Sequence, residues 1–417
     1  MAHRPRRLAF VYQPRPFSIL ALAEAARAVC DLMWVVDTTV PELDSVPRLL
    51  RRFGAVIDVG GLSLDEAAAA IEAERPGGIL ALADSSLAWT AEVAQRLRLP
   101  SVTPEVAGRL TDKDAQRRAL RAGGVPVPGF WLVPEAGDGK GWASLARAAR
   151  FPAVLKPQRG EGGREVVPVT SLDEVRSIAA AGRRGAPHAR LMLEEYLRDR
   201  PREDDRAFGD VVSVESVVSG GRVSHLATTG RFPFAEPFRE TGSFIPSALD
   251  EDEREAVLGV ASAAIAALDI TVGCQHTEIK LTPDGPRVIE VNGRVGAGVP
   301  DMLAAVTDID LLAIAMRIAL GDELVFDEMP HCAQVVYVLL AQAPVWMRRI
   351  TAVDGLDQLR ADPSVRRAIL ARGPGQTVDW RDGLWGHVFS VEGVVADHER
   401  LKVLAQRVES NIQIRGE

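Results

Sequence analysis

Cysteine is scarce in this chain, with three residues of this type among 417. Cys30, Cys274 and Cys332 are too few and too scattered to build a disulfide framework or a zinc site. Long hydrophobic runs are also missing, and none approaches the roughly 20 apolar residues that a membrane-spanning helix needs. The N-terminal segment "MAHRPRRLAF" is basic but lacks the long apolar core of a signal peptide. We therefore expect a soluble, cytoplasmic protein with no membrane partner.

Positive charge is in deficit, since the formal net charge is −8 at pH 7. This argues against a nucleic-acid partner that is bound mainly through its phosphates. The hydrophobic fraction of 47% and the charged fraction of 25% are typical of a globular chain with an ample core. The length allows about three domains. The sequence leaves open whether the protein forms a homodimer.

Two common nucleotide-binding signatures are absent. The segment from residue 1 to about 105 alternates short apolar runs such as "RLAFVYQ" (7–13) with helix-like stretches such as "FSILALAEAARAVC" (17–30). This alternation predicts a Rossmann-like parallel α/β domain. However, "QPRPF" follows the first expected strand in place of a glycine fingerprint, which argues against a dinucleotide site. The Walker pattern G-x-x-x-x-G-K-[ST] does not occur either.

The pattern changes after residue 105. Thr111 or Asp112 can cap a helix that runs to the Gly123-Gly124 pair. From about residue 326 the chain holds short β-prone runs, which predict a small antiparallel β-rich domain. The fold class expected is thus mixed α/β (α+β). The expected divisions are residues 1–105, a small subdomain at 106–190, a large subdomain at 191–325, and 326–417.

The segment "GCQHTEIKLTPDGPRVIEVNGRVGAG" (273–298) predicts a hairpin around the turn "TPDGP". Symmetric pairing sets Glu278 opposite Glu290, and it also sets His276 opposite Asn292 and Lys280 opposite Val288. The other face is mostly apolar and consists of Thr277, Ile279, Leu281, Ile289 and Val291.

Like charges placed directly opposite each other destabilise a sheet, so we expect a positive group between Glu278 and Glu290. Two carboxylates and the Asn292 carbonyl are the hard oxygen ligands that suit Mg²⁺ beside substrate phosphates. The alternative is a surface hairpin that Lys280 and Arg294 neutralise. His276 is better placed for a hydrogen-bonded or phosphate-side role than for metal ligation.

Two further segments carry weaker signals. Lys156 precedes the turn "QRGEGG" (158–163), whose backbone N–H groups can converge on an anion beside the lysine charge. The alternative is an ordinary surface hairpin. The run "LMLEEYL" (191–197) reads either as an ordinary edge strand or as a strand whose free backbone contacts an adenine edge.

Taken together, these segments resemble the ATP-grasp superfamily over roughly residues 105 to 325. The most specific part is Glu278, an eleven-residue gap, Glu290, then Asn292 and Arg294. The resemblance implies an ATP-grasp fold. It also implies that Glu278, Glu290 and Asn292 hold Mg²⁺ (or Mn²⁺) on ATP, with Arg294 at the reacting carboxylate.

The resemblance implies further contacts with ATP. Lys113 opens the small subdomain, Lys156 reaches the α- and β-phosphates, and the glycine turn forms a lid over them. Val211 stands where many members carry a glutamate near the sugar, which moves the expected sugar contact to Asp204 or Asp205. The expected nucleotide-binding residues are Lys113, Lys156, Gly160, Gly162, Gly163, Glu194, Glu195 (through its carbonyl), Leu197 (through its amide) and His276.

Within the superfamily, "FRETGSFIPSALDEDERE" (238–255) resembles the bacterial L-amino-acid ligases. The resemblance implies ATP-dependent amide-bond formation between an amino acid and an amine through an acyl phosphate, with Lys156 and Arg294 as catalytic residues. Glu240 would meet the donor ammonium. Ser243 replaces a common histidine and Gly298 a position that can be bulky and aromatic, which implies a larger donor.

Two other functions stay open at this stage. The first is a biotin-carboxylase-like ATP-dependent carboxylase, although the glycine loop of such enzymes is normally richer than "QRGEGG". The second is a non-catalytic ATP-binding protein, which the intact set of two acids, asparagine and arginine argues against.

Overall fold

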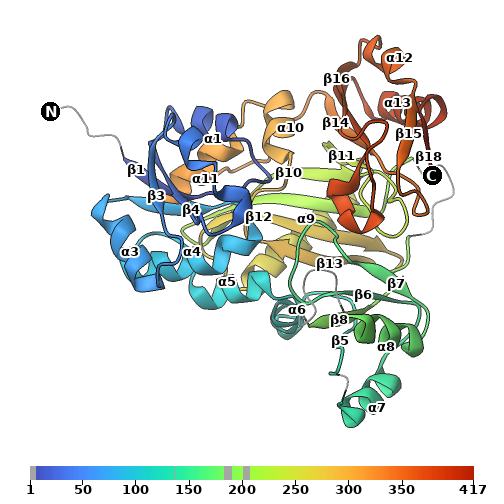
Figure 1. The fold of residues 1–417 in the computed structure, drawn as a ribbon, viewed down its shortest axis with the longest axis horizontal. Coiled ribbons are helices and arrows are strands. Elements are labelled where there is room, and N and C mark those ends of the chain that lie inside the picture. The colour runs from blue at the N-terminus through green and yellow to red at the C-terminus, as the bar shows by residue number, and fades with distance from the viewer. Residues whose placement is uncertain (1–5, 136, 183–189, 201–206) are drawn as a thin grey trace.

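The computed structural model describes residues 6–135, 137–182, 190–200 and 207–417. Figure 1 shows a parallel sheet near the N-terminus, a long central sheet, a smaller sheet beside it, and the C-terminal elements around the far end of the central sheet. Within the described residues, no helix is long and apolar enough to cross a membrane.

The N-terminal sheet is parallel, with strand order β3-β2-β1-β4. Its strands are short apolar runs, as expected for a parallel sheet that helices cover on both faces. The predicted α/β character of this segment is therefore confirmed. The elements are β1 (Arg7–Val11), α1 (Ile19–Ala26), β2 (Asp31–Val36), η1 (Pro41–Leu43), α2 (Pro47–Leu50), β3 (Ala55–Asp58), α3 (Leu64–Ala73), β4 (Gly78–Ala81) and α4 (Asp84–Leu97).

The small sheet has the order β5-β8-β6-β7 and is antiparallel throughout. Of the two predicted caps, Asp112 is the one observed at the start of the following helix, where its side chain accepts from the Asp114 and Ala115 amides. The elements are α5 (Pro104–Thr111), α6 (Lys113–Ala122), β5 (Phe130–Leu132), α7 (Gly139–Ala148), β6 (Ala153–Pro157), β7 (Val167–Val169), α8 (Leu172–Ala181) and β8 (Leu191–Glu195).

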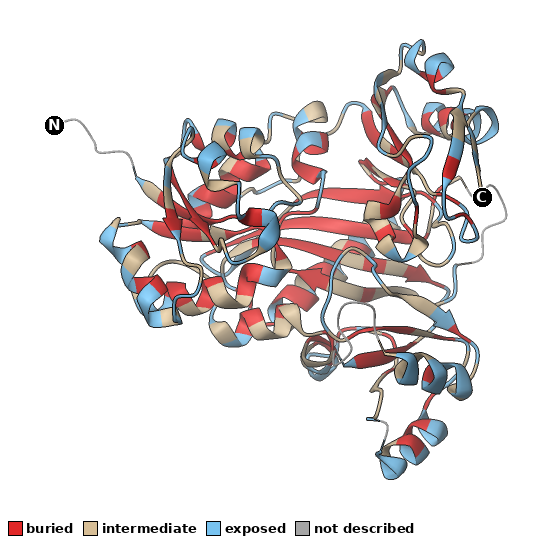
Figure 2. Cartoon of the chain, in the orientation of Figure 1, coloured by how far each residue is buried: buried red, intermediate tan, exposed pale blue. Residues whose placement is uncertain are grey.

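The central sheet has eight antiparallel strands in the order β13-β12-β9-β10-β11-β14-β17-β16. Figure 2 shows buried residues along most of these strands, which form the middle of the molecule. The elements of this part are β9 (Val211–Ser219), β10 (Arg222–Arg231), β11 (Gly242–Ile245), α9 (Glu251–Ala267), β12 (Gly273–Thr282), β13 (Gly285–Asn292), α10 (Val299–Val306) and α11 (Leu311–Ala319).

The C-terminal strands are antiparallel, as predicted, but β14, β17 and β16 extend the central sheet, because β14 pairs with β11. Strands β15 and β18 form a separate two-stranded sheet. The division of the chain near residue 326 therefore does not interrupt the sheet, and the four-segment division stays a prediction. The remaining elements are β14 (Val335–Ala341), β15 (Ile350–Asp354), α12 (Leu356–Arg360), β16 (Val365–Leu370), η2 (Trp380–Gly386), β17 (Phe389–Val395), α13 (His398–Asn411) and β18 (Gln413–Gly416).

The β12–β13 hairpin has the predicted register at its functional end. Glu278 pairs with Glu290 and His276 pairs with Asn292. Nearer the turn the prediction was wrong, because the register shifts after Glu278 and Lys280 pairs with Arg287 instead of Val288.

The extra residue at this shift is Ile289, which the symmetric pairing placed on the apolar face. A bulge leaves one residue unpaired and turns the strand locally. Ile289 consequently lines the cavity described below, while Val288 pairs with Ile279 and packs in the buried core with Val291.

Candidate active site

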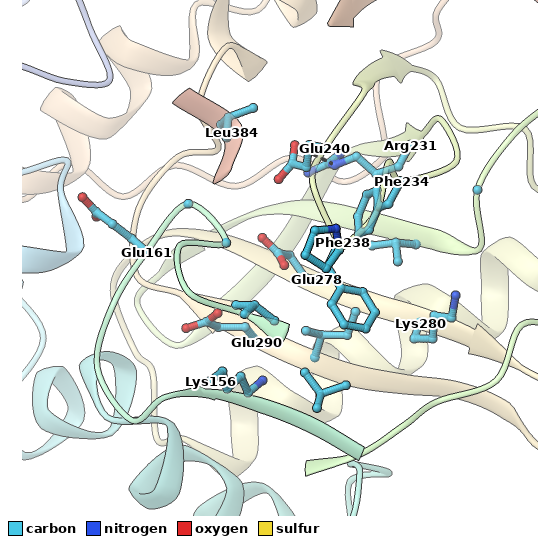
Figure 3. A pocket seen from close by; sticks show the side chains of 18 of the residues that line it. Lys156, Glu161, Arg231, Phe234, Phe238, Glu240, Glu278, Lys280, Glu290 and Leu384 are labelled. Atoms are coloured by element: carbon cyan, nitrogen blue, oxygen red, sulfur yellow. Dashed lines mark ion pairs between the residues drawn. The ribbon is translucent and has the colours of Figure 1, made fainter. Parts of the chain in front are cut away.

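A cavity of about 1120 Å³ lies between the small sheet, the edge of the central sheet and η2. Figure 3 shows its labelled side chains, with Lys156, Glu278 and Glu290 near the middle. The cavity collects every predicted site residue except Gly298. They are Lys113, Lys156, Gly160, Gly162, Gly163, Glu194, Glu195, Leu197, Glu240, Ser243, His276, Glu278, Glu290, Asn292 and Arg294.

Glu290 is paired with Lys113, whose Nζ lies 2.7 Å from its Oε1. The same Nζ donates to the Gly160 carbonyl oxygen over 2.8 Å. Helix α6 holds Lys113 in this position because Gln116 exchanges two hydrogen bonds of 2.9 Å with the backbone of Val291. The side-chain amide of Gln116 thereby supplies hydrogen-bond partners to the backbone at the free edge of strand β13.

Glu278 is paired with His276, whose Nε2 lies 3.5 Å from its Oε1. The Nδ1 of His276 lies 2.9 Å from both carboxylate oxygens of the buried Glu215. Burial lowers the pKa of His276, but the Glu215 and Glu278 carboxylates outweigh it and raise the pKa to about 9. Burial raises the pKa of Glu278, but the charged His276 and nearby arginines outweigh it and lower the pKa to about 2.

The two opposed carboxylates thus each have their own cation, Lys113 for Glu290 and His276 for Glu278. The expected positive group between the two acids stays a prediction, because these cations lie beside one acid each. The alternative in which Lys280 and Arg294 neutralise them was wrong, because Lys280 pairs with Asp199 and Arg294 with Asp84.

Lys156 ends strand β6 and is buried in a charge cluster. Its Nζ lies 2.5 Å from Glu194, which also lies 2.9 Å from Nε of Arg117. Burial lowers the pKa of Lys156. Burial raises the pKa of Glu194, but the two cations outweigh it and the net direction is downward. Arg117 and Lys156 thus hold the Glu194 carboxylate between them. Through its contact with Arg117, Glu194 in turn fixes the position of Lys156.

The end of the cavity beside β8 is partly apolar. The Tyr196 and Phe238 ring centroids lie 6.0 Å apart, and Phe234 lines the same region. Glu195 exchanges hydrogen bonds with the Gly129 backbone, through its amide over 2.7 Å and its carboxylate over 2.9 Å. Val211 lines the cavity, whereas Asp204 and Asp205 lie outside the described residues.

Arg294 is anchored by Asp84, the first residue of α4. Its Nε and Nη2 lie 2.9 and 2.8 Å from Asp84 Oδ2, and its Nη1 donates to the Val295 carbonyl oxygen over 3.1 Å. Burial lowers the pKa of Arg294, but Asp84 outweighs it and raises the pKa. A guanidinium has five N–H donors, so two remain for a ligand in the cavity once these three are counted.

Glu240 and Ser243 stand at the substrate side that the sequence predicted. Arg231 Nε lies 3.6 Å from Glu240 Oε2, and its Nη2 lies 3.4 Å from His276 Nε2. Among the described residues, the buried Nη1 of Arg231 has no hydrogen-bond partner. Ser243 Oγ lies 3.8 Å from the sulfur of Met302.

Gly298 does not line the cavity, although Ala297 and Val299 on either side of it do. It precedes the first turn of α10 with a φ of 74°, a left-handed conformation in which glycine is favoured. The backbone thus explains this glycine, and its role in substrate selection stays a prediction.

No protein-family model matches the sequence. The uncharacterized protein y4rH of Sinorhizobium fredii is 26% identical over 382 residues, which cover 90% of this chain and 72% of that protein. Carnosine synthase 1 of Gallus gallus is 30% identical over 264 residues, which cover 59% of this chain. The matched region spans 27% of the length of carnosine synthase 1.

Solved structures match over almost the whole chain. The L-amino acid ligase from Bacillus licheniformis has a TM-score of 0.75 at 19% identity and covers 100% of both chains. The chain therefore has the ATP-grasp fold. The biotin carboxylase domain of the Hydrogenobacter thermophilus 2-oxoglutarate carboxylase, solved with MgADP, ADP and bicarbonate, has a TM-score of 0.68 at 15% identity. It covers 99% of this chain and 91% of that chain.

The ATP-grasp cavity also contains residues that sequence reasoning missed. Asp84 follows the carboxyl end of β4, a position where open α/β sheets commonly bind ligands, and that signal could have found it. The aromatic run "FPFAEPF" contains Phe234 and Phe238 and is a second usable signal. Arg231 and Glu161 carried no distinguishing pattern.

The glycine loop of this ATP-grasp chain contacts an element that the sequence could not connect with it. The Leu384 amide of η2 donates to the Gly162 carbonyl oxygen over 3.2 Å. Gly160, Gly162 and Gly163 all have positive φ, which explains the glycines in this turn. The loop is thus held between α6 on one side and the C-terminal part of the chain on the other.

Proposed function

We propose that the protein is an ATP-dependent carboxylate–amine ligase. It joins the carboxylate of an amino acid to the amine of a second small molecule through an acyl phosphate and releases ADP and phosphate. The observation that carries this proposal is the single cavity that holds Glu278, Glu290 and Asn292 together with the cations Lys156 and Arg294.

The nucleotide would lie along the small sheet. Its adenine would reach the backbone of Glu195 and Leu197 beside Phe238, and its phosphates would pass Lys156 and the glycine loop. Backbone N–H groups in such a turn and a lysine charge are suited to phosphate oxygens. The likeness to a solved domain that contains MgADP supports this placement.

The residues present fit a divalent cation that is bound together with ATP. Within the described residues, no three His, Cys, Asp or Glu side chains gather into a metal site. Mg²⁺ commonly uses one or two carboxylates and completes its shell with phosphate oxygens and water. Asn292 donates its amide nitrogen to the His276 carbonyl oxygen over 3.3 Å, which leaves its amide oxygen as a ligand atom. The bound ion, Mg²⁺ or Mn²⁺, supplies neutralisation of phosphate charge.

The chain would contribute position and charge to two steps. In the first, a substrate carboxylate oxygen attacks the γ-phosphorus of ATP and ADP leaves. Arg294 has two donors for that carboxylate and later for the oxyanion at the acyl carbon. In the second step an amine forms the C–N bond and phosphate leaves. Phosphoryl transfer of this kind depends mainly on positioning and charge neutralisation.

The donor is proposed to be an α-amino acid whose ammonium group meets Glu240. The full-length likeness to an L-amino acid ligase supports an amino acid in this place. Arg231 already compensates part of the negative charge of Glu240. The contact between Glu240 and the donor ammonium would therefore fix the orientation of the donor more than it raises the affinity. A cytoplasmic location and a homodimer stay predictions.

A carboxylase is the second candidate, because a biotin carboxylase domain shares the fold over 99% of this chain. Phosphate release from MgATP, measured against pairs of amino acids with product masses, separates the two. The ligase reading expects release that requires both a carboxylate and an amine, with a product equal to their sum minus water. Release that requires bicarbonate and biotin, with no amide product, would overturn it. Glu290→Gln serves as the inactive control.

A further inference from the structure

A side arm of the cavity lies where three segments that are distant in the sequence meet. A Cβ on Gly162 would lie 3.1 Å from Nε1 of Trp385, so the glycine loop packs closely on the indole. The guanidinium carbon of Arg15 also lies over the Trp385 ring, 4.7 Å from its centroid. Arg15, Glu161, Leu384 and Trp385 all line the cavity, and we call these four residues the side arm.

The side arm lies away from the proposed adenine end of the cavity. Figure 3 places Glu161 and Leu384 on one side of the pocket and Phe234, Phe238 and Lys280 on the other. Asp84 and Arg294 influence the charge of Glu161. The side arm therefore lies next to the arginine proposed for the reacting carboxylate.

Most carboxylates of the cavity already have a cation of the protein beside them. Among the cavity-lining carboxylates that the structure describes, only Glu161 and Glu236 lack a Lys, Arg or His nitrogen within 4.0 Å. Glu236 lies between Phe234 and Phe238 in the sequence, and Figure 3 places both phenylalanines on the side of the pocket opposite Glu161. Glu161 is therefore the carboxylate on the substrate side that is free to accept a proton.

The surroundings of Glu161 favour its protonated form. Although Glu161 is exposed, desolvation by the surrounding cavity wall and the charge of Asp84 raise its pKa. Arg294, Arg164 and the Asp84 backbone amide act in the opposite direction but do not outweigh them. A general base works best when its pKa lies near the operating pH, and a carboxylate with a raised pKa comes closer to that condition.

We infer that the side arm is the subsite for the amine substrate, that Glu161 accepts the proton of its ammonium group, and that Arg15 pairs with a carboxylate on the same molecule. This inference rests on the ligase function proposed above. It assigns the acceptor to the class of amino acids or other amines that carry a carboxylate.

The proton balance of the step is complete. The ammonium group gives one proton to the Glu161 carboxylate and becomes a neutral amine. The nitrogen lone pair forms the C–N bond at the acyl carbon, and the C–O bond to phosphate breaks with its electron pair on phosphate. The second proton of the nitrogen leaves with that phosphate, so the products are the amide, hydrogen phosphate and protonated Glu161.

Arg15 suits the carboxylate of such an acceptor. Among the described residues, no carboxylate oxygen lies within 4.0 Å of its guanidinium nitrogens. Arg6, Arg7 and Arg27 in the same segment each form an ion pair, whereas Arg15 forms none with a described residue. The Arg15 guanidinium lies over the Trp385 ring, a cation–π contact that positions it without using a carboxylate. A guanidinium can hold a carboxylate through two parallel hydrogen bonds.

The test of Glu161 compares two acceptors. Hydroxylamine is largely unprotonated at neutral pH and needs no base, whereas an amino acid is an ammonium ion. Glu161→Gln is expected to lower kcat with an amino-acid acceptor by about 10²-fold or more. Hydroxamate formation from the same donor is expected to stay near the wild-type rate, which also shows that the variant is folded. Asp173→Asn, a surface carboxylate of α8, is the control and should change neither rate.

The test of Arg15 compares an amino acid with its carboxamide as acceptor. Arg15→Gln is expected to raise KM for the amino acid by about tenfold or more, since a charged pair is lost. It should leave KM for the carboxamide unchanged. Arg27→Gln, at the residue that follows α1, is the matched surface control.

The outcomes distinguish this inference from the function beneath it. Equal losses with amino acid and hydroxylamine in Glu161→Gln would mean a structural role and overturn the assignment of the base. Equal KM changes for both acceptors in Arg15→Gln would overturn the carboxylate contact. Wild-type protein that forms neither amide nor hydroxamate from any donor would overturn the ligase function itself.

Discussion

Lys113 Nζ lies 2.7 Å from Oε1 of Glu290 and so forms an ion pair with a carboxylate that is proposed to bind the metal. Lys113 is the first residue of α6, and Glu290 lies in β13, two residues before the end of that strand. A cation that arrives with ATP must therefore share or replace this contact. Lys113 would then be released toward the phosphates, so metal binding and phosphate binding are coupled through one ion pair.

Glu290→Gln is predicted to abolish ligase turnover, with a fall of about 10²-fold or more, because charge stabilisation by a bound metal is worth several kcal/mol. The like-charge pairing with Glu278 disappears, but Lys113 loses its partner, so unfolding stability should fall by about 1–3 kcal/mol. Phosphate release and thermal unfolding check the two effects. Lys113→Gln combined with Glu290→Gln should recover part of the stability but none of the turnover. Turnover near that of the wild type would contradict the metal assignment.

Glu240→Ala is predicted to raise KM for the amino-acid donor by roughly 30-fold. Loss of one partner of a buried charge pair costs about 2–5 kcal/mol, and the lower end of that range gives this factor at about 1.4 kcal/mol per factor of ten. KM for ATP should not change, because Glu240 is proposed to contact only the donor. Donor kinetics with alanine, a long aliphatic and a polar amino acid provide the measurement. Des-amino acids are the matched substrates, and they should bind wild type and variant equally poorly. If they react as well as amino acids do, Glu240 is not the ammonium site.

Gly162→Ala is predicted to reduce turnover by about tenfold, since small displacements of a positioning loop are costly. The φ of 68° is strained for alanine, and its Cβ would lie 3.1 Å from Trp385. Gly108→Ala in α5 is the control, because a Cβ there meets nothing within 4 Å and its φ is not positive. Hydrogen exchange of residues 158–163 should fall when a non-hydrolysable ATP analogue binds to wild type. Unchanged exchange would argue against closure of this loop over ATP.

The sequence was sufficient for the parts of the site that are local in the chain. The turn and the opposed acids predicted the Glu278–Glu290 and His276–Asn292 pairs, because hairpin register follows from the turn and the alternation of side chains. The bulge at Ile289 was not predictable, since nothing in the alternation marks an extra residue there. The ATP-grasp fold was implied by the resemblance of the motifs to that superfamily, and the comparison with solved structures confirmed the fold.

Most partners of the charged residues could not be predicted, because they come from distant elements. Arg294 pairs with Asp84, which is 210 residues earlier in the chain, and Trp385 meets the glycine loop from the C-terminal part. Lys113 reaches Glu290 from helix α6, 177 residues earlier. His276, in contrast, lies two residues before Glu278 on the same strand.

The pH dependence of stability should report the His276–Glu215 contact in protein stripped of metal and nucleotide. The pKa of His276 is raised from 6.5 to about 9 in the folded state, so folding binds a proton more tightly there. The stabilisation is complete below pH 6.5, decreases between pH 6.5 and 9 as the unfolded chain alone gives up the proton, and is absent above that range. The loss can reach about 3 kcal/mol for a shift of this size.

Thermal unfolding of the wild type should therefore show a falling Tm across this window. His276→Gln removes the titrating group and should flatten the decrease, while the contributions of Lys156 and other titrating groups remain in both proteins. A wild-type Tm profile with the same slope as that of His276→Gln would mean that His276 is not charged in the folded protein, and Glu278 would then lack the cation assigned to it.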